Sequence, residues 1–280
     1  MYKQLILLSF ADKRYTTALS RIRELTKDFP FTLRYFLNED DLPKEYMKTL
    51  RYKTHRRGFG YWKWKSYLVK NMLEKMQNGD ILVYSDAGVY WNNKGLKRFQ
   101  EYLYMLESGK DFIITFQQPY LEKDYSKGDI LGFTDTYDNA DITVSLQLWG
   151  GLFILKKSTE AVDFVNKWYD LCHNHYYLIT DRKSERQNLP GFIENRHDQS
   201  AFSLLVKQHS HIEISYKECQ AVNRVWDDMD EYPMQGRRDN KRLLSLKEKI
   251  KRKSFIPYKR MIGLYLKIFE HMHFAVVPNW

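Results

Sequence analysis

Cysteine and long apolar runs are scarce in this sequence of 280 residues, and each shortage excludes a class of protein. The two cysteines, Cys172 and Cys219, form neither a metal-binding spacing nor a disulfide framework, which favours a reducing compartment. No stretch approaches the roughly 18 consecutive apolar residues that a membrane-spanning helix needs. The run Leu5–Leu8 is too short for the apolar part of a secretion signal. We therefore interpret this run as a first strand and expect a cytoplasmic protein.

Glycine is missing from Ser9–Tyr15, the segment that includes the end of this first strand. A nucleotidyltransferase normally carries a glycine-rich loop there, whose backbone N–H groups hold phosphates. The absence disfavours that class of enzyme. It stays an alternative, because it too uses a carboxylate at a strand end together with a metal ion.

Basic charge is abundant but is concentrated near one end of the chain. Gly236–Arg260 contains eleven Lys or Arg residues and only two acidic ones, so this segment supplies +9 of the net charge of +10. We therefore expect a nearly neutral domain over residues 1–235 and a basic extension over residues 236–280. A non-enzymatic RNA-binding protein is the alternative that basicity and abundant aromatic residues suggest, but no RNA-binding motif combines the two.

Short apolar runs alternate with amphipathic segments, which is typical of an α/β fold with a mainly parallel sheet. A hydrophobic content of 43% excludes a disordered chain. We expect strands at Lys3–Phe10, Thr32–Phe36, Ile81–Tyr84, Asp111–Thr115 and Leu146–Leu155, the last interrupted at Trp149-Gly150-Gly151. We expect helices at Tyr15–Phe29, Tyr46–Lys53, 61–72, Lys94–Glu107, 161–172 and from about Asp198, and irregular loops at Gln117–Asp141 and His173–Asn195.

The segment Gly79–Trp91 is the most informative one. A turn leads into the continuous apolar run Ile81–Tyr84, which stops just before Asp86. Such a run is typical of a buried parallel strand, and open α/β sheets bind ligands at the carboxyl edge of their strands. Asp86 is therefore a candidate for holding a divalent cation that neutralises a nucleotide diphosphate. The alternative is an aspartate that satisfies a turn.

A second polar group precedes the helix whose buried side includes Phe202, Leu205 and Val206. The start of this helix presents His197, Asp198 and Gln199 in a row. Asp198 could orient a sugar hydroxyl, and His197 could act as a base or a metal ligand. The alternative, equally favoured, is that Asp198 is simply the N-cap of the helix.

Two further features fit a ligand site but are weaker. The pair Gly150-Gly151 permits close backbone approach where a side chain would collide with a ligand, although a bulge is the commoner reason. Lys63 and Lys65 flank Trp64 at the start of a helix, where a lysine can reach phosphate oxygens. A solvated lysine is the commoner outcome.

Together these pieces resemble bacterial glycosyltransferases of the GT-A type, in particular those of capsule and lipopolysaccharide synthesis. Four motifs carry the resemblance over roughly residues 1–225, in the order that the family shows: Gly58-Phe-Gly-Tyr-Trp-Lys-Trp-Lys65, Gly79-Asp-Ile-Leu-Val-Tyr-Ser-Asp-Ala-Gly88, Trp149-Gly-Gly-Leu-Phe-Ile-Leu-Lys-Lys157 and Arg196-His-Asp-Gln-Ser200. The resemblance implies a GT-A fold and sugar transfer from a nucleotide-diphosphate donor.

The resemblance also assigns residues. The implied donor-binding residues are Phe10, Ala11 and Tyr15 around the nucleotide base, Gly150 and Gly151 under the donor sugar, and Lys65, Tyr84 and Asp86. Asp198, Gln199 and His197 are the implied catalytic residues. Asp86 matches the first carboxylate of an Asp-x-Asp metal motif, but Gly88 replaces the second. The implied Mn²⁺ or Mg²⁺ would therefore have Asp86 and His197 as ligands, or would be dispensable.

The implied donor is a UDP-sugar, and the implied acceptor is a surface polysaccharide, a lipopolysaccharide or a lipid-linked glycan. The extension adds a predicted membrane contact: Met261–Phe269 is an apolar segment, expected to be helical, beside the basic run, and this combination suits an anionic membrane surface. The alternative is a helix that packs on the domain with its basic side in solvent.

Overall fold

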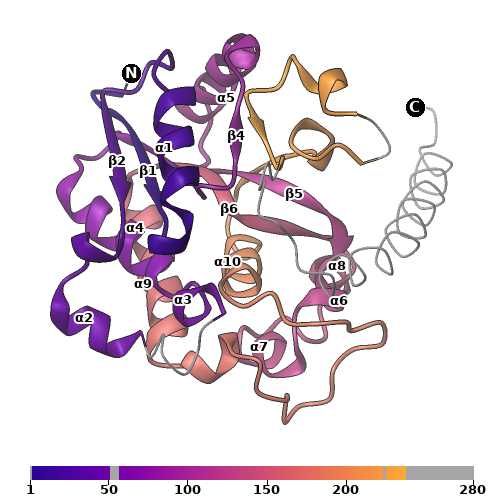
Figure 1. Cartoon of the computed structure of the whole chain (residues 1–280). Coiled ribbons are helices and arrows are strands. Elements are labelled where there is room, and N and C mark those ends of the chain that lie inside the picture. Colours follow the sequence, from indigo (N-terminus) through magenta and orange to yellow (C-terminus); the bar gives the residue numbers. More distant parts are fainter. Residues whose placement is uncertain (1, 51–56, 223–224, 238–280) are drawn as a thin grey trace, which may run out of the picture.

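The computed structural model of the chain describes residues 2–50, 57–222 and 225–237, which form an α/β fold with a central sheet (Figure 1). The expected basic extension, beyond its first two residues, and its membrane-binding segment 261–269 lie outside the described residues. Within the described residues, no helix is long and apolar enough to cross a membrane.

The central sheet has six strands in the order β2-β1-β3-β6-β5-β7. Their bounds, in chain order, are β1 Leu5–Phe10, β2 Leu33–Leu37, β3 Ile81–Ser85, β5 Ile113–Leu121, β6 Leu146–Lys156 and β7 Ile212–Ile214. β1 pairs in parallel with β2 and β3, and β5 with β7, whereas β6 is antiparallel to both of its neighbours. The mainly parallel sheet expected from the sequence is confirmed, with β6 as its exception. A small second sheet pairs β4 (Tyr90–Trp91) with β8 (Met234–Gln235).

Helices cover both faces of the sheet (Figure 1). The longer ones are α1 Thr16–Leu25, α4 Trp64–Lys75, α5 Leu96–Ser108, α9 Thr159–His173 and α10 Asp198–Val206. The shorter ones are α2 Lys44–Thr49, α3 Gly58–Tyr61, α6 Glu122–Tyr125, α7 Gly128–Phe133 and α8 Ala140–Thr143. Single 3₁₀ turns lie at Lys13–Tyr15, Glu39–Asp41, Asn93–Gly95, Tyr176–Ile179, Tyr216–Glu218 and Trp226–Met229.

Alternate residues of the strands supply two separate cores. Leu5 and Leu7 of β1 pack with α1 and α5, whereas Ile6 and Leu8 pack with α4, α9 and α10. All six residues of β1 are buried, because a strand covered by helices on both faces has no side in water. The continuous apolar run in the sequence is the direct result.

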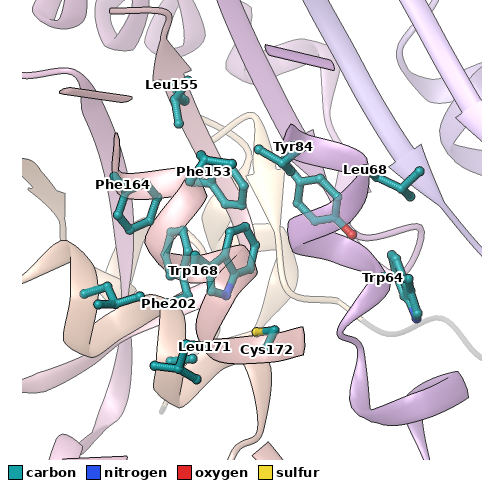
Figure 2. Close-up of a cluster of buried hydrophobic side chains, with 14 of the residues drawn as sticks. Trp64, Leu68, Tyr84, Phe153, Leu155, Phe164, Trp168, Leu171, Cys172 and Phe202 are labelled. Carbon is teal, nitrogen blue, oxygen red and sulfur yellow. The ribbon is translucent and has the colours of Figure 1, made fainter. Parts of the chain in front are cut away.

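Aromatic rings fix the helices of the second face. Phe164 and Trp168 of α9 meet Phe202 of α10 with ring centroids 5.7 and 5.3 Å apart, and Phe153 of β6 stacks on Phe202 at 4.9 Å (Figure 2). Burying each such ring contributes about 1.5–3 kcal/mol. This packing sets the position of α10, and Tyr84 and Trp64 lie on the same side of the sheet (Figure 2).

Three expectations about local structure are wrong. Gln117–Asp141 is not an irregular loop: β5 continues to Leu121, and α6, α7 and α8 follow. Helices of four to six residues are too short to show a helical period in sequence. β6 runs without a break through Trp149-Gly150-Gly151, and the irregularity appears instead as shifts of register in its pairing with β5. In addition, α1 ends at Leu25, four residues before the expected end.

Candidate active site at the carboxyl edge of the sheet

β1 and β3 lie side by side, but the chain leaves them toward opposite sides of the sheet. After β1 it passes through α1 to β2 on one side, and after β3 it passes through α5 to β5 on the other. A parallel α/β sheet opens a crevice where neighbouring connections diverge in this way, at the carboxyl ends of the strands. Phe10 ends β1 and Asp86 follows β3, so both residues lie at this switch point.

Asp86 is anchored at this edge by its backbone while its side chain stays accessible. Its N–H donates to the Gly151 carbonyl at 2.8 Å, and its own carbonyl accepts from the Val89 N–H at 2.9 Å. The Tyr84 hydroxyl donates to Oδ1 at 2.8 Å. The side chain is 33% exposed. The backbone of Asp86 therefore forms the turn, and its carboxylate remains available to a ligand.

Lys65 joins two carboxylates in one buried cluster. Its Nζ lies 2.9 Å from Asp198 Oδ2 and 3.5 Å from Asp86 Oδ1, and its side chain is only 3% exposed. Burial lowers the pKa of Lys65, but the two carboxylates outweigh burial and its pKa is raised overall. The ammonium is therefore charged at neutral pH. The sequence predicted a lysine that reaches phosphate; the structure shows one that holds Asp86 and Asp198 together.

Asp198 is not the N-cap of α10. His197 occupies that position, without a capping side-chain bond, and Asp198 is the first residue of the helix. Burial raises the pKa of Asp198 to about 6, Lys65 opposes this rise, and Asp86 adds to it. The alternative of a capping aspartate is wrong, because the carboxylate is used in the cluster with Lys65.

His197 lies next to this cluster in sequence but makes different contacts. Its Nδ1 lies 2.7 Å from the Ile179 carbonyl, and its Nε2 lies 3.7 Å from Asp181 Oδ1. The ring is buried against Tyr61 and Trp62, at centroid distances of 4.8 and 5.5 Å. Burial lowers the pKa of His197 to about 4, so it is neutral at physiological pH. Since a carbonyl only accepts, Nδ1 carries the proton and Nε2 is the acceptor.

The residues present do not by themselves fit a metal ion. Divalent cations with oxygen ligands take six or more of them. Asp86 supplies one carboxylate, whose Oδ1 already faces Lys65 and Tyr84, and Gly88 adds none. In the part of the chain that the structure describes, no cluster of three or more His, Cys, Asp or Glu side chains could hold an ion. The predicted pairing of Asp86 with His197 as ligands stays a prediction.

The glycine pair of β6 permits close approach, but to the protein's own side chains. A Cβ at position 151 would lie 2.4 Å from Asp86 Oδ2 and 2.6 Å from Trp149 Nε1. A Cβ at position 150 would lie 3.1 Å from the Cα of Gln199. The two glycines therefore let Asp86 and Gln199 lie directly on the strand, and they form the floor between these side chains.

Of the three residues expected around a nucleotide base, one is accessible. Phe10 is buried under Trp64, with ring centroids 4.2 Å apart. Ala11 is also buried, and its N–H donates to the Leu37 carbonyl at 3.1 Å. Tyr15 is 40% exposed and precedes α1. Contact of Phe10 and Ala11 with a base stays a prediction, and Tyr15 offers the open aromatic face.

Backbone strain next to the site was not foreseen from the sequence. All five residues of 58–62 have positive φ, including Phe59 at 53°, Tyr61 at 54° and Trp62 at 58°. Each non-glycine residue in this region costs on the order of 1–3 kcal/mol and persists only where its surroundings enforce it. Trp64 Nε1 donates to the Gly58 carbonyl at 3.0 Å and helps to close the segment. The strained turn directs the start of α4, and with it Lys65, into the site.

A buried polar network behind Gln199 was also not foreseen. Glu122 is fully buried and accepts hydrogen bonds from Ser126 at 2.6 Å, from Gln147 at 2.9 Å and from Lys207 at 2.7 Å. Gln147 in turn accepts from Gln199.

Two open surface cavities, of about 490 and 420 Å³, lie over residues 132–141 and along α9, and neither includes Asp86, Lys65 or Asp198.

No protein family model matches the sequence, and neither does any curated protein. Solved structures of similar shape include a glycosyltransferase involved in the glycosylation of the major capsid of PBCV-1, with a TM-score of 0.48 and 11% identity over 95% of this chain and 99% of that one. They also include mouse xyloside xylosyltransferase 1 (TM-score 0.43, 11% identity, 86% and 87% covered) and galactosyltransferase LgtC with donor and acceptor sugar analogs (0.44, 11%, 84% and 80%). What this chain does is inferred below from its own residues.

Proposed function

We propose that this protein is a glycosyltransferase that transfers a sugar from a nucleotide-diphosphate donor to a glycan acceptor. The observation that carries the proposal is the position of Asp86: its partly exposed carboxylate lies at the switch point of the sheet and shares the buried ammonium of Lys65 with Asp198. Carboxylates at the edge of a crevice accept hydrogen bonds from sugar hydroxyls. The four ordered sequence motifs add support, because each contributes a residue to this one edge.

In this proposal the described residues divide the work. Asp86 binds the donor, and Lys65 holds Asp86 and Asp198 at a fixed separation. Asp198 and Gln199 lie beside the reacting carbon. A pKa of about 6, which burial gives to Asp198, suits a group that holds or releases a proton near neutral pH. His197 is neutral and buried, so its proposed role as a base depends on Nε2, which faces Asp181.

We extend the proposal to a UDP-sugar as donor and to a surface polysaccharide, lipopolysaccharide or lipid-linked glycan as acceptor, on the resemblance of the motifs alone. A Mn²⁺ or Mg²⁺ ion belongs to the proposal only as a companion of the diphosphate, since the described residues form no complete ion site. Peripheral binding to the inner face of the membrane is proposed for residues 237–269, on their charge pattern.

The test is a thermal-shift panel of UDP, GDP and their sugars on the full chain, each with and without Mn²⁺. A ligand that binds only the native state stabilises it by about 2.7 kcal/mol at a hundred times its Kd. We expect at least one nucleoside diphosphate to raise the melting temperature and Asp86→Asn to abolish that rise. A panel without any shift contradicts the proposal. UTP, GTP and a short single-stranded RNA are included as further arms: a shift with the triphosphates alone points to a nucleotidyltransferase, and a shift with RNA alone points to an RNA-binding protein.

A further inference from the structure

The side-chain amide of Gln199 is held at one end only. Its Nε2 donates to Gln147 Oε1 at 2.7 Å, and the residue is half-buried over Gly150. Among the described residues, no hydrogen-bond donor is assigned to its Oε1. The Oε1 of Gln199 is therefore available to accept a hydrogen bond at the floor of the site.

The orientation of that amide follows from the buried carboxylate of Glu122. The carboxylate accepts from Ser126, Gln147 and Lys207, and Ser203 also donates to it. The Ser203 Oγ also accepts the Leu148 N–H at 2.9 Å. Lys207 lies 2.7 Å from the carboxylate and can only donate, so Glu122 is paired as a carboxylate and acts as the acceptor toward Gln147.

The acceptor role of Glu122 then fixes the orientation of two side-chain amides in turn, first Gln147 and then Gln199. Gln147 must turn its NH₂ toward Glu122, which leaves its oxygen facing Gln199. Gln199 must turn its own NH₂ toward that oxygen, so its Oε1 is the end that stays available. The reverse orientation of either amide would set two donors or two acceptors against each other in a buried place, which is costly.

We propose that Glu122 and Gln147 are positioning residues that fix Gln199 with its carbonyl oxygen toward the ligand, where it accepts a hydrogen bond from a sugar hydroxyl. This inference rests on the proposed function for the identity of the ligand. This orientation of Gln199 makes the site selective for a ligand with a hydrogen-bond donor opposite Oε1. An analogue with a pure acceptor there is rejected, because a buried site rejects a ligand that leaves its polar groups unpaired.

We call the series of hydrogen bonds from Glu122 through Gln147 to Gln199 the relay. The test variant is Gln147→Leu, which removes the relay but leaves Glu122 as the buried partner of Lys207. Glu122→Gln is less suitable, because it would remove that partner. We measure by calorimetry the Kd of the nucleoside diphosphate that stabilises the protein and the Kd of its nucleotide sugar. Gln147→Leu should weaken the nucleotide sugar roughly tenfold, the loss of one hydrogen bond, and leave the bare diphosphate within twofold. The matched control is Gln235→Leu, since Gln235 is equally buried but lies on β8.

A second variant keeps the proposal falsifiable if Gln147→Leu acts through the fold. In Gln199→Glu the new carboxylate accepts hydrogen bonds in every orientation, so it does not need the relay to orient it. One of its oxygens would, however, face the Gln147 Oε1, and two acceptors in contact are unfavourable. Adding Gln147→Leu to Gln199→Glu should therefore strengthen binding of the nucleotide sugar, the opposite sign to its effect in the natural chain. Equal weakening in both backgrounds, or equal weakening of sugar and bare diphosphate, overturns the relay.

A ligand-free measurement separates this inference from the proposed function. In ¹⁵N-labelled protein, the side-chain NH₂ of Gln199 should exchange slowly with solvent and become fast in Gln147→Leu. If no nucleotide binds the natural chain, the proposed function fails, and this exchange measurement alone decides the relay. Fast exchange in the natural chain contradicts the relay even if nucleotides bind.

Discussion

The ammonium of Lys65 lies 2.9 Å from the carboxylate of Asp198, and each of these side chains is about 95% or more out of solvent. Such a pair adds little net stability when intact, because both charges lose their hydration. Substituting only one partner of the pair is strongly destabilising, since the remaining charge is then buried without a partner. The contact therefore makes Lys65 a residue on which both the fold and the site depend.

We expect Lys65→Met to destabilise the protein by about 3–5 kcal/mol, the usual cost of breaking a buried ion pair at one partner. Urea unfolding at neutral pH measures this cost. The matched control is Lys75→Met at the end of the same helix, because Lys75 is exposed. Adding Asp198→Asn should recover part of the lost stability. Equal costs for the two lysines would show that the cluster does not depend on Lys65.

Asp86→Asn and Asp198→Asn should each lower transfer at least about a hundredfold while the protein stays folded. Each change removes a charge and almost no volume. Since Asp198 is not a cap, the good capping tendency of asparagine cannot rescue it. The control is Asp80→Asn, because Asp80 is a buried aspartate that binds backbone N–H groups of Gln4 and Gln77 away from the site. Full activity in Asp198→Asn would leave that residue a structural role.

Gly151→Ala should impair nucleotide binding, because the new Cβ would lie 2.4 Å from Asp86 Oδ2. The overpacking should also cost about 1–3 kcal/mol of stability. Gly88→Ala is the matched control: it lies two residues from Asp86, and its Cβ would meet no atom within 4 Å. Thermal shift with the stabilising nucleotide compares the two variants. If both bind like the natural chain, Asp86 does not need its present place against β6.

Acid should destabilise the protein through two histidines, the half-buried His173 and the buried His197. Burial lowers the pKa of His173 and of His197 to about 4, from about 6.5 in the unfolded chain. Between pH 4 and 6.5 the unfolded state binds more protons, so this part of the stability rises with pH and is complete above about 6.5. Asp198 contributes with the opposite sign between about 4 and 6, since burial raises its pKa.

The contribution of one histidine is isolated by comparing variants. His173→Gln should reduce the slope of unfolding free energy against pH by up to about 1.4 kcal/mol per pH unit in this window. Chemical unfolding at several pH values measures the slope. His175→Gln, at a neighbouring histidine whose side chain is 37% exposed, is the control. An unchanged slope in His173→Gln would mean that this ring is protonated in the native protein.

Truncation after Arg237 should leave the described fold intact and abolish binding to anionic vesicles. The cut spares β8 and the bond from the Gly236 N–H to the Cys219 carbonyl, at 2.7 Å. Each basic residue near an anionic surface contributes about 1 kcal/mol, and salt screens this attraction. Sedimentation of the full chain with such vesicles should therefore weaken as salt rises. Sedimentation that ignores lipid charge, or a truncated chain that unfolds, contradicts a membrane-binding tail.

The sequence predicted the parts of the site that depend on local pattern. The apolar run before Asp86 is continuous and ends at a clear boundary, so the strand, its carboxyl end and the carboxylate there could be predicted from it. The partners of Asp86 did not follow, because Lys65 and Asp198 come from distant segments that only the packed sheet brings together. Glu122 gave no signal at all: it opens a helix of four residues, and its role depends on Lys207, 85 residues further along.

The single reversed strand has a consequence for how such a site can change. Because β6 runs against its neighbours, it carries Gly150-Gly151 past the switch point in mid-strand, between Leu152, which pairs with Ser85 of β3, and Leu148, which pairs with Gln117 of β5. The segment that leads into α10, residues 180–197, has no regular secondary structure. Related chains that handle different sugars are therefore expected to share the glycine floor and to differ in length and sequence along this segment. Loop exchange between them is the natural route to a new specificity.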